Sequence, residues 1–335
     1  MTTFKEIRGT AIESVSSDPT NPEEGQIWYN NTIGVLKGYQ LVAAAWAAGG
    51  NTPISKFGIA GAGTQTAGLG FGGYFPTFSN VTIEYDGSAW TAGGNLGTAR
   101  NAPGGLGTQT AGLAFGGDPG SPPFSSVATE EYDGSAWAGG GNLNTGRRIL
   151  AGSGIQTAGL GFGGYRDGVG PQVATESYNG TSWTSVNSMN TARYGLSSAS
   201  AGPQTATLAF GGGESPNLSA TESWNGTSWT TVNSMNTAKS GGGGAGIQTL
   251  ALSFGGFTGP SNVVTTATES WNGTSWTTTS SMATARKSFG SNGVSTAALA
   301  FMGTTVNTSP SNPGVTNATE EWTGPTLVTK KITTS

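Results

Sequence analysis

The ten residues ATESWNGTSW occupy positions 220–229 and occur again, letter for letter, at positions 267–276. A near copy, ATESYNGTSW, lies at positions 174–183. A short β-prone stretch, an Asn-Gly pair and a second stretch that opens with tryptophan are together typical of a β-hairpin. A hairpin that recurs along the chain predicts a repeat architecture in which each copy forms one supersecondary unit.

Each copy follows an apolar stretch that ends in phenylalanine, and in five of six cases Gly-Gly comes next; the sixth has Met302 instead of the first glycine. Successive phenylalanines are 44, 47, 48, 44 and 47 residues apart, and the six repeats cover roughly residues 41–323. The six are Phe71, Phe115, Phe162, Phe210, Phe254 and Phe301.

Four short strands are predicted in each repeat. The first consists of small residues, as in GLSSASAG (195–202), and the second alternates apolar positions, as in TAGLGFGG (66–73). The ATESW part forms the third strand, and Asn-Gly or Asp-Gly then predicts a type I′ turn with positive φ at both central residues. The fourth strand opens with a tryptophan: Trp90, Trp137, Trp183, Trp229 or Trp276.

A four-stranded antiparallel unit cannot bury both of its faces alone, whereas six such units stacked around an axis can. Gly, Ala and Ser in the first strand suit the crowded axis. The sequence therefore predicts an all-β chain that forms a six-bladed β-propeller. A long β-solenoid is the alternative, although its periods are usually shorter and it does not require a hairpin in every repeat.

The Gly-Gly pair, an aromatic residue in the third strand and a tryptophan five residues later resemble kelch repeats. The third-strand aromatics are Tyr85, Tyr132, Tyr178, Trp224, Trp271 and Trp322. The resemblance covers most of residues 41–323 and weakens in the sixth repeat. It implies four-stranded kelch-like blades in a propeller and almost nothing about activity.

The ends of the repeat region indicate how a ring would close. Trp46 precedes the first small strand, whereas Leu327 stands where the last repeat should have its second tryptophan. We expect the strand around Trp46 to complete the blade that begins near residue 287. The predicted organisation is an attachment segment at 1–40, a propeller at 41–324 and a C-terminal tail at 325–335.

Charged residues make up only 10% of the chain, yet two kinds recur at fixed places in the repeats. A cation stands ten residues after each fourth-strand tryptophan, and a glutamate stands two residues before the third-strand aromatic in every repeat except the first, which has Ile83. We expect each cation to pair with a glutamate, because partly buried charges need partners; a ring of free cations that binds an anion is the alternative. The set comprises Lys56, Arg100, Arg147, Arg193, Lys239, Arg286, Glu130, Glu176, Glu222, Glu269 and Glu320.

The chain has no histidine and no cysteine, which removes the commonest general base, the commonest transition-metal ligand and any thiol chemistry. The kelch-like copper oxidases need histidine, and the sialidase Asp-box matches YDGSAW only loosely. Asp118, Asp167 and Glu214 are the only acids in the variable loops, and no catalytic pair is evident among them. We expect a non-catalytic protein with no cofactor and no metal.

Net charge is −4 without a basic run, so nothing indicates a nucleic-acid partner. The longest apolar run, at 41–48, is too short to insert into a membrane. The N-terminus lacks the basic start and apolar core of an export signal. We expect a soluble protein made in the cytoplasm.

The repeats differ most after Gly-Gly, where loops of variable length are expected to emerge on one face. Variable loops on a rigid scaffold are where binding tends to reside. Several loops carry aromatics that either cap the core or bind sugars or protein. The candidate binding residues are Tyr74, Phe75, Phe78, Phe124, Tyr165, Arg166 and Phe257.

Residues 1–40 lie outside the repeats and predict a hairpin from QIWY (26–29), an Asn-Asn turn and VLKGY (35–39), with Trp28 and Tyr29 as attachment residues. Asp18-Pro19, Asn21-Pro22 and GQIWYN (25–30) resemble the N-terminal parts of virion structural proteins of tailed bacteriophages, especially marine ones.

That resemblance implies a virion protein, made in the host cytoplasm, in the tail or a fibre. Its N-terminal segment would bind other virion proteins or further copies of the chain, and its loop face would bind a host-surface glycan or protein. The alternatives are a structural or decoration subunit that packs against other virion proteins, and a cellular kelch-type adaptor.

Overall fold

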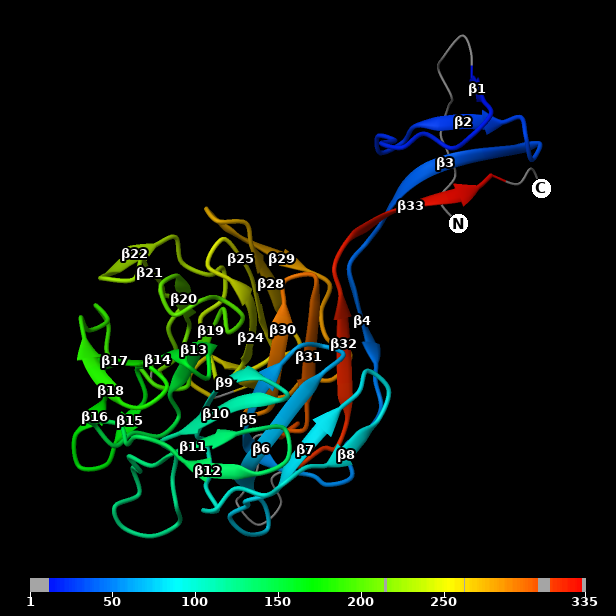
Figure 1. Cartoon of the computed structure of the whole chain (residues 1–335). Helices are drawn as coiled ribbons and strands as arrows, with labels where there is room; N and C mark the ends of the chain where they lie inside the picture. The colour runs from blue at the N-terminus through cyan, green and yellow to red at the C-terminus, as the bar shows by residue number, and fades with distance from the viewer. Residues whose placement is uncertain (1–11, 214–215, 262, 307–313, 333–335) are drawn as a thin grey trace. The chain divides into compact units, whose positions relative to one another are not determined.

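The computed structural model describes residues 12–213, 216–261, 263–306 and 314–332, and it divides the chain into two compact units (Figure 1). Unit 1 contains Met1–Ala44 and Gly324–Ser335, and unit 2 contains Ala45–Thr323. The described residues form strands and no helix, which confirms the all-β prediction. The ends of the predicted attachment segment (1–11) and tail (333–335) lie outside the described residues.

The described part of unit 2 contains six four-stranded antiparallel sheets, numbered here in chain order. The first three are β5 (Phe57–Gly63), β6 (Gly68–Tyr74), β7 (Thr82–Tyr85) and β8 (Trp90–Ala92); β9 (Gly104–Thr108), β10 (Ala111–Phe115), β11 (Thr129–Tyr132) and β12 (Trp137–Gly139); and β13 (Ala151–Ile155), β14 (Ala158–Phe162), β17 (Thr175–Tyr178) and β18 (Trp183–Val186).

The other three sheets keep the same strand order. They are β19 (Ser197–Ser198), β20 (Thr207–Phe210), β21 (Thr221–Trp224) and β22 (Trp229–Val232); β24 (Gly243–Ile247), β25 (Leu250–Phe254), β28 (Thr268–Trp271) and β29 (Trp276–Thr279); and β30 (Gly290–Val294), β31 (Ala297–Phe301), β32 (Thr319–Thr323) and β4 (Ala45–Ala48). Shorter pairings involve β15 (Tyr165–Arg166) with β16 (Gly170–Pro171), and β26 (Phe257–Thr258) with β23 (Lys239–Ser240) and β27 (Val263–Val264).

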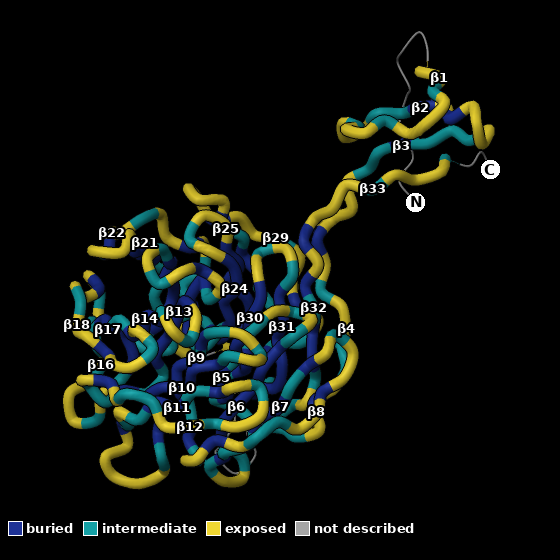
Figure 2. Tube along the Cα trace, viewed as in Figure 1, coloured by how far each residue is buried: buried dark blue, intermediate teal, exposed yellow. Residues whose placement is uncertain are grey.

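The first strands of successive sheets lie beside one another: β5 contacts β9, then β13, β19, β24 and β30 follow in order, and β30 contacts β5. Figure 2 shows buried chain along these inner strands. Their small residues have a steric cause. A Cβ added to Gly61 would lie 2.6 Å from the carbonyl oxygen of Ser291, and one added to Gly244 would lie 2.3 Å from that of Ser198.

Aromatic side chains fill the space between sheets in a repeated pattern. The second-strand phenylalanine of each sheet packs against a fourth-strand tryptophan of a neighbouring sheet, with ring centroids 4.7–5.0 Å apart. The pairs are Phe71–Trp137, Phe115–Trp183, Phe162–Trp229, Phe210–Trp276, Phe254–Trp46 and Phe301–Trp90.

Each of these tryptophans also donates its indole N–H to a third-strand threonine of the adjacent sheet, across 2.9–3.1 Å. The donor and acceptor pairs are Trp46 and Thr268, Trp90 and Thr319, Trp137 and Thr82, Trp183 and Thr129, Trp229 and Thr175, and Trp276 and Thr221. Every sheet is thus joined to its neighbour by the same polar and apolar contacts.

The N-terminal strand of unit 2 occupies the place expected from the sequence. β4 pairs with β32 in antiparallel register, with Trp46 opposite Trp322, and completes the sheet that begins with β30. The two rings are 5.5 Å apart.

The turns between the third and fourth strands correct the type I′ prediction. Tyr178 pairs with Trp183, so the connection contains four residues, and Gly180 has positive φ whereas Asn179 does not. The Asn179 side-chain oxygen accepts hydrogen bonds from the backbone N–H groups of Thr181 and Ser182 at 2.9 Å. An Asn or Asp side chain that supports its own turn in this way needs no left-handed conformation.

Unit 1 contains one four-stranded sheet in the order β1 (Glu13–Val15), β2 (Ile27–Asn30), β3 (Val35–Val42) and β33 (Thr326–Lys331). The expected hairpin is β2–β3. The structure differs from the expected division at 40/41 and from a separate tail at 325–335, because β3 extends to Val42 and β33 pairs with it. A two-stranded hairpin is marginal alone, and the C-terminal strand enlarges its sheet.

Candidate recognition face

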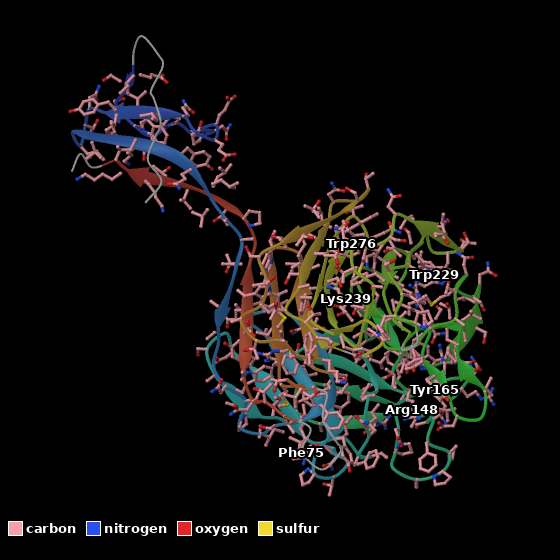
Figure 3. All side chains as sticks on the ribbon, turned by 180° about the vertical axis from the view of Figure 1, so that it is seen from behind. Phe75, Arg148, Tyr165, Trp229, Lys239 and Trp276 are labelled. Carbon is pink, nitrogen blue, oxygen red and sulfur yellow. The ribbon has the colours of Figure 1, made fainter. Side chains whose placement is uncertain are left out.

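The described parts of the loops between the second and third strands of the six sheets are called the loop face here; Glu214, one of the three loop acids, lies outside the described residues. These loops begin where the second strand ends, beside the start of the first strand. Figure 3 shows Phe75 and Tyr165, from two different sheets, toward one end of unit 2, with Trp229 and Trp276 toward the other.

A cycle of backbone hydrogen bonds lies at the start of the first strands. In each sheet, one N–H group donates to the carbonyl oxygen of the equivalent residue in the neighbouring sheet across 2.7–3.1 Å, and the bond from Gly58 to Ser288 completes the cycle. All six residues have φ between 50° and 62°. They are Gly58, Ala102, Ile149, Gly195, Gly241 and Ser288.

Left-handed φ is uncommon for non-glycine residues and is an outlier for a β-branched residue such as Ile149. The cycle holds Ile149 there through two bonds, as its N–H donates to Ala102 and its carbonyl accepts from Gly195. Sequence reasoning missed this feature because only three of its six positions are glycine.

A hollow of about 280 Å³ opens at this cycle. Its lining includes the apolar residues that follow the cycle, among them Ile59, Pro103, Leu150, Leu196 and Phe289. It offers an apolar depression at the centre of the loop face.

The repeated cations mostly form the expected ion pairs. Arg147 pairs with Glu176 at 2.9 Å, Arg193 with Glu222 at 3.0 Å, and Arg286 with Glu320 at 2.7 Å; Arg100 pairs with Glu130.

The Arg193–Glu222 pair shows how each charge is satisfied. Arg193 is fully buried and donates to the carbonyl oxygens of Gly211 and Ala220, whereas Glu222 accepts from the backbone N–H of Asn190. The two terminal nitrogens of the guanidinium thus find their partners within the protein, whereas the buried Nε has none among the described residues.

The two lysines depart from this pattern. Lys239 Nζ donates to the carbonyl oxygens of Ser253 and Ala267 at 3.1 and 3.2 Å, and burial lowers the pKa of Lys239 to about 8, against the opposing effect of Glu269. Lys56 has Ile83 where the other repeats have glutamate, and it donates to the carbonyl oxygen of Phe75 at 2.7 Å. Burial also lowers the pKa of Lys56.

A second repeated network joins third strands. The Tyr85 hydroxyl donates to Glu321 of the sixth sheet at 2.5 Å, and Tyr132 donates to Glu84 of the first sheet at 2.5 Å. Tyr178 donates to Glu131 in the same way. Burial and the carboxylate partner raise the pKa of each tyrosine to about 12.

The other three third strands carry tryptophan instead of tyrosine, and the preceding sheet then has serine instead of glutamate. The pairs are Ser177 before Trp224, Ser223 before Trp271 and Ser270 before Trp322. These tryptophans donate their indole N–H to backbone carbonyl oxygens. The exchange is visible in the sequence, and reading neighbouring repeats together would have found it.

The predicted aromatics of the first two loops differ in exposure. Tyr74 packs edge to face against Phe78 at 5.0 Å and against Phe57 at 5.5 Å, and Tyr74, Phe75 and Phe78 are partly buried. Phe124 is 42% exposed and remains available for contact.

In the later loops, the structure corrects the prediction that Phe257 is a binding residue. Phe257 is only 9% exposed and lies beneath the Lys287 ammonium, 4.9 Å from its ring, so it caps the core. Tyr165 is partly buried, with Arg148 5.3 Å above its ring, and Arg166 is exposed.

The two predicted attachment residues, Trp28 and Tyr29, also differ in burial. Trp28 is fully buried and donates to Asp18, which also accepts from Lys37 at 2.6 Å. Hydrogen bonds from Lys37, Asn30 and Trp28 lower the pKa of Asp18 to about 2. Tyr29 points to the opposite face of the strand and is 40% exposed. Trp28 is therefore a core residue, and only Tyr29 can make an external contact.

Comparison with protein-family models and with curated proteins found no match to this chain. Within the described ranges, no helix is long and apolar enough to cross a membrane. The same residues contain no group of three or more acidic side chains placed to hold a metal ion.

Proposed function

We propose that unit 2 is a closed six-bladed β-propeller of kelch-like repeats, and that its loop face is the recognition surface of a non-catalytic tailed-bacteriophage virion protein. In this proposal the protein belongs to the tail or a fibre, unit 1 attaches it to other virion proteins, and the loop face binds the host surface.

Three repeated contacts support ring closure, because each also joins the sixth sheet to the first. Trp90 donates to Thr319, the rings of Trp90 and Phe301 pack together, and Gly58 donates to Ser288. An open stack of six sheets would lack these contacts at its ends and would leave two sheet faces unpaired.

The observation that carries the recognition role is the contrast between the scaffold and its loops. The contacts between sheets are nearly identical around unit 2, whereas the loops between second and third strands differ in length, composition and exposed side chains. Exposed Phe124 and Arg166 contribute nothing to the repeated contacts between sheets. Variation confined to one face of a rigid scaffold favours binding there.

The attachment role rests on residues 16–30, which resemble phage virion proteins, and on the exposed side of the unit 1 sheet. Tyr29 and Val42 are 40% and 37% exposed, and they lie on the face opposite Trp28. Tyr29 therefore offers an exposed aromatic ring for a protein contact on this face.

A packing subunit is the second candidate, favoured by Tyr74, Phe78 and Phe257, which pack within the protein instead of projecting outward. Such a subunit would use its loops against neighbouring virion proteins. A cellular kelch-type adaptor would bind neither particles nor host envelopes.

Two binding measurements test the proposal. Purified protein is mixed with particles that lack it and, separately, with envelopes of the host cell. We expect Tyr29→Ala to weaken incorporation into particles and spare envelope binding, and Phe124→Ala with Tyr165→Ala to do the reverse. Incorporation without any envelope binding would instead support the packing subunit, and failure of both would support the cellular adaptor.

A further inference from the structure

A groove of about 510 Å³ lies on the loop face between the third and fourth sheets. Tyr165 and Pro171 line it from one loop, Pro216 and Leu218 line it from the next, and Tyr194 comes from the connection between the sheets. Its volume lies within the range of small-molecule sites.

Two tyrosines form a fixed aromatic corner in this groove. The rings of Tyr165 and Tyr194 meet edge to face, with centroids 5.3 Å apart and planes inclined by 72°. Tyr165 exchanges two backbone hydrogen bonds with Arg148, at 2.8 and 3.0 Å, and Arg148 also lies over its ring. The corner is therefore positioned before any ligand arrives, which limits the entropic cost of binding.

The charges around the groove are compensated. Arg193, which lines it, pairs with Glu222, and the Arg148 guanidinium lies 3.5 Å from Asp118 and 3.0 Å from Asp167. Arg166 is exposed, but it alternates with Tyr165 on the two-residue strand β15 and does not line the groove. A ligand held through an anionic group would find no uncompensated cation among the described lining residues.

We propose that this groove binds a neutral saccharide of the host surface, with a pyranose ring against the corner formed by Tyr165 and Tyr194. A pyranose presents C–H groups on its faces and hydroxyl groups at its edge, so it suits a groove whose aromatic and proline walls lie beside a polar residue such as Thr191. This inference rests on the proposed recognition role of the loop face and specifies the class of its ligand.

The test is a binding array of neutral hexose and N-acetylhexosamine oligomers, sialylated and sulfated glycans, and a proline-rich peptide, probed with the full chain. We expect binding to at least one neutral oligomer, unchanged in 0.5 M NaCl. In titrations of that oligomer, Tyr165→Ala and Tyr194→Ala should each weaken binding about tenfold. Val169→Ala and Val263→Ala change exposed loop residues that do not line the groove; they are the matched loop-face controls and should remain within about twofold of the parent.

A groove-filling variant, Leu218→Trp, covers the case in which a tyrosine variant fails to fold, and it should also abolish binding. The inference is overturned by binding only to anionic glycans or to the peptide, by the absence of neutral binding, or by neutral binding that survives all three groove variants. Envelope binding by the parent without any neutral glycan binding would overturn this inference and leave the proposed function standing. Absence of envelope binding would overturn the proposed function itself.

Discussion

The backbone N–H of Gly58, at the start of the first sheet, donates a hydrogen bond to the carbonyl oxygen of Ser288, before the sixth sheet, across 2.7 Å. An equivalent bond joins each of the remaining pairs of neighbouring sheets in the described part of unit 2. Residues far apart in the sequence are thereby placed as neighbours in a cycle. This relationship underlies the proposed ring and the proposed role of its loop face.

Trp46→Ala tests the strand that completes the sixth sheet. Trp46 is partly buried, packs against Trp322 and Phe254 and donates to Thr268. We therefore expect the free energy of unfolding to fall by about 3 kcal/mol, the lower end of the range for truncation of a fully buried tryptophan. Urea unfolding measures the change. Trp46→Phe keeps a ring and should lose less; an alanine variant as stable as the parent would contradict a closing role for β4.

Lys239→Arg tests the ion-pair pattern. Arginine at the equivalent positions reaches the glutamate of the same repeat, whereas Lys239 bonds only to two carbonyl oxygens. A new pair with Glu269 should stabilise the protein by about 1 kcal/mol. Lys56→Arg is the matched control and should give no such gain, because Ile83 replaces its glutamate. Equal effects of the two changes would contradict the pattern.

The lowered pKa of Lys239 predicts a dependence of stability on pH. Its value is about 8 in the folded protein and 10.5 in the reference state, so the unfolded chain binds more protons between these values. The unfolding free energy of the parent should therefore rise from pH 8 to pH 10 relative to that of Lys239→Met. Parallel curves for the two proteins across this interval would show that the buried amine keeps its ordinary pKa.

A double substitution tests the exchange of Glu–Tyr for Ser–Trp between neighbouring third strands. Ser177→Glu should destabilise the protein because Trp224 offers no hydroxyl, and Trp224→Tyr should leave a cavity. Together they recreate the contact of Glu131 with Tyr178, so the double variant should be more stable than the sum of the single effects by about 1 kcal/mol. Chemical unfolding of all four proteins gives this coupling. Strict additivity would show that the exchange has no energetic basis.

Features that recur at the repeat period could be predicted from the sequence. The four strands, the position of Trp46 and the pairing of Arg193 with Glu222 all follow from residues that return at equal intervals. The small first strands were predictable for the same reason, because a Cβ at Gly61 or Gly244 would collide with the next strand.

Features without a repeated residue type could not be predicted in this way. The backbone cycle accepts Ala102 and Ile149 beside glycines, so side-chain identity does not mark it. The pairing of β33 with β3 joins the two ends of the chain, and neither strand has a copy elsewhere. Exposure separates Phe124 from Phe257, two aromatics in equivalent loops, and depends on what each loop packs against.

Native-state hydrogen exchange at the backbone amide of Gly58 tests the proposed ring most directly. In a closed propeller, this amide is held by Ser288 as the amides of Ala102 and Gly241 are held by their neighbours, so all three should exchange only through large-scale opening. We predict similar protection factors for the three amides. Rapid exchange at Gly58 with strong protection at Ala102 and Gly241 would contradict closure, because it would show that the first and sixth sheets do not meet.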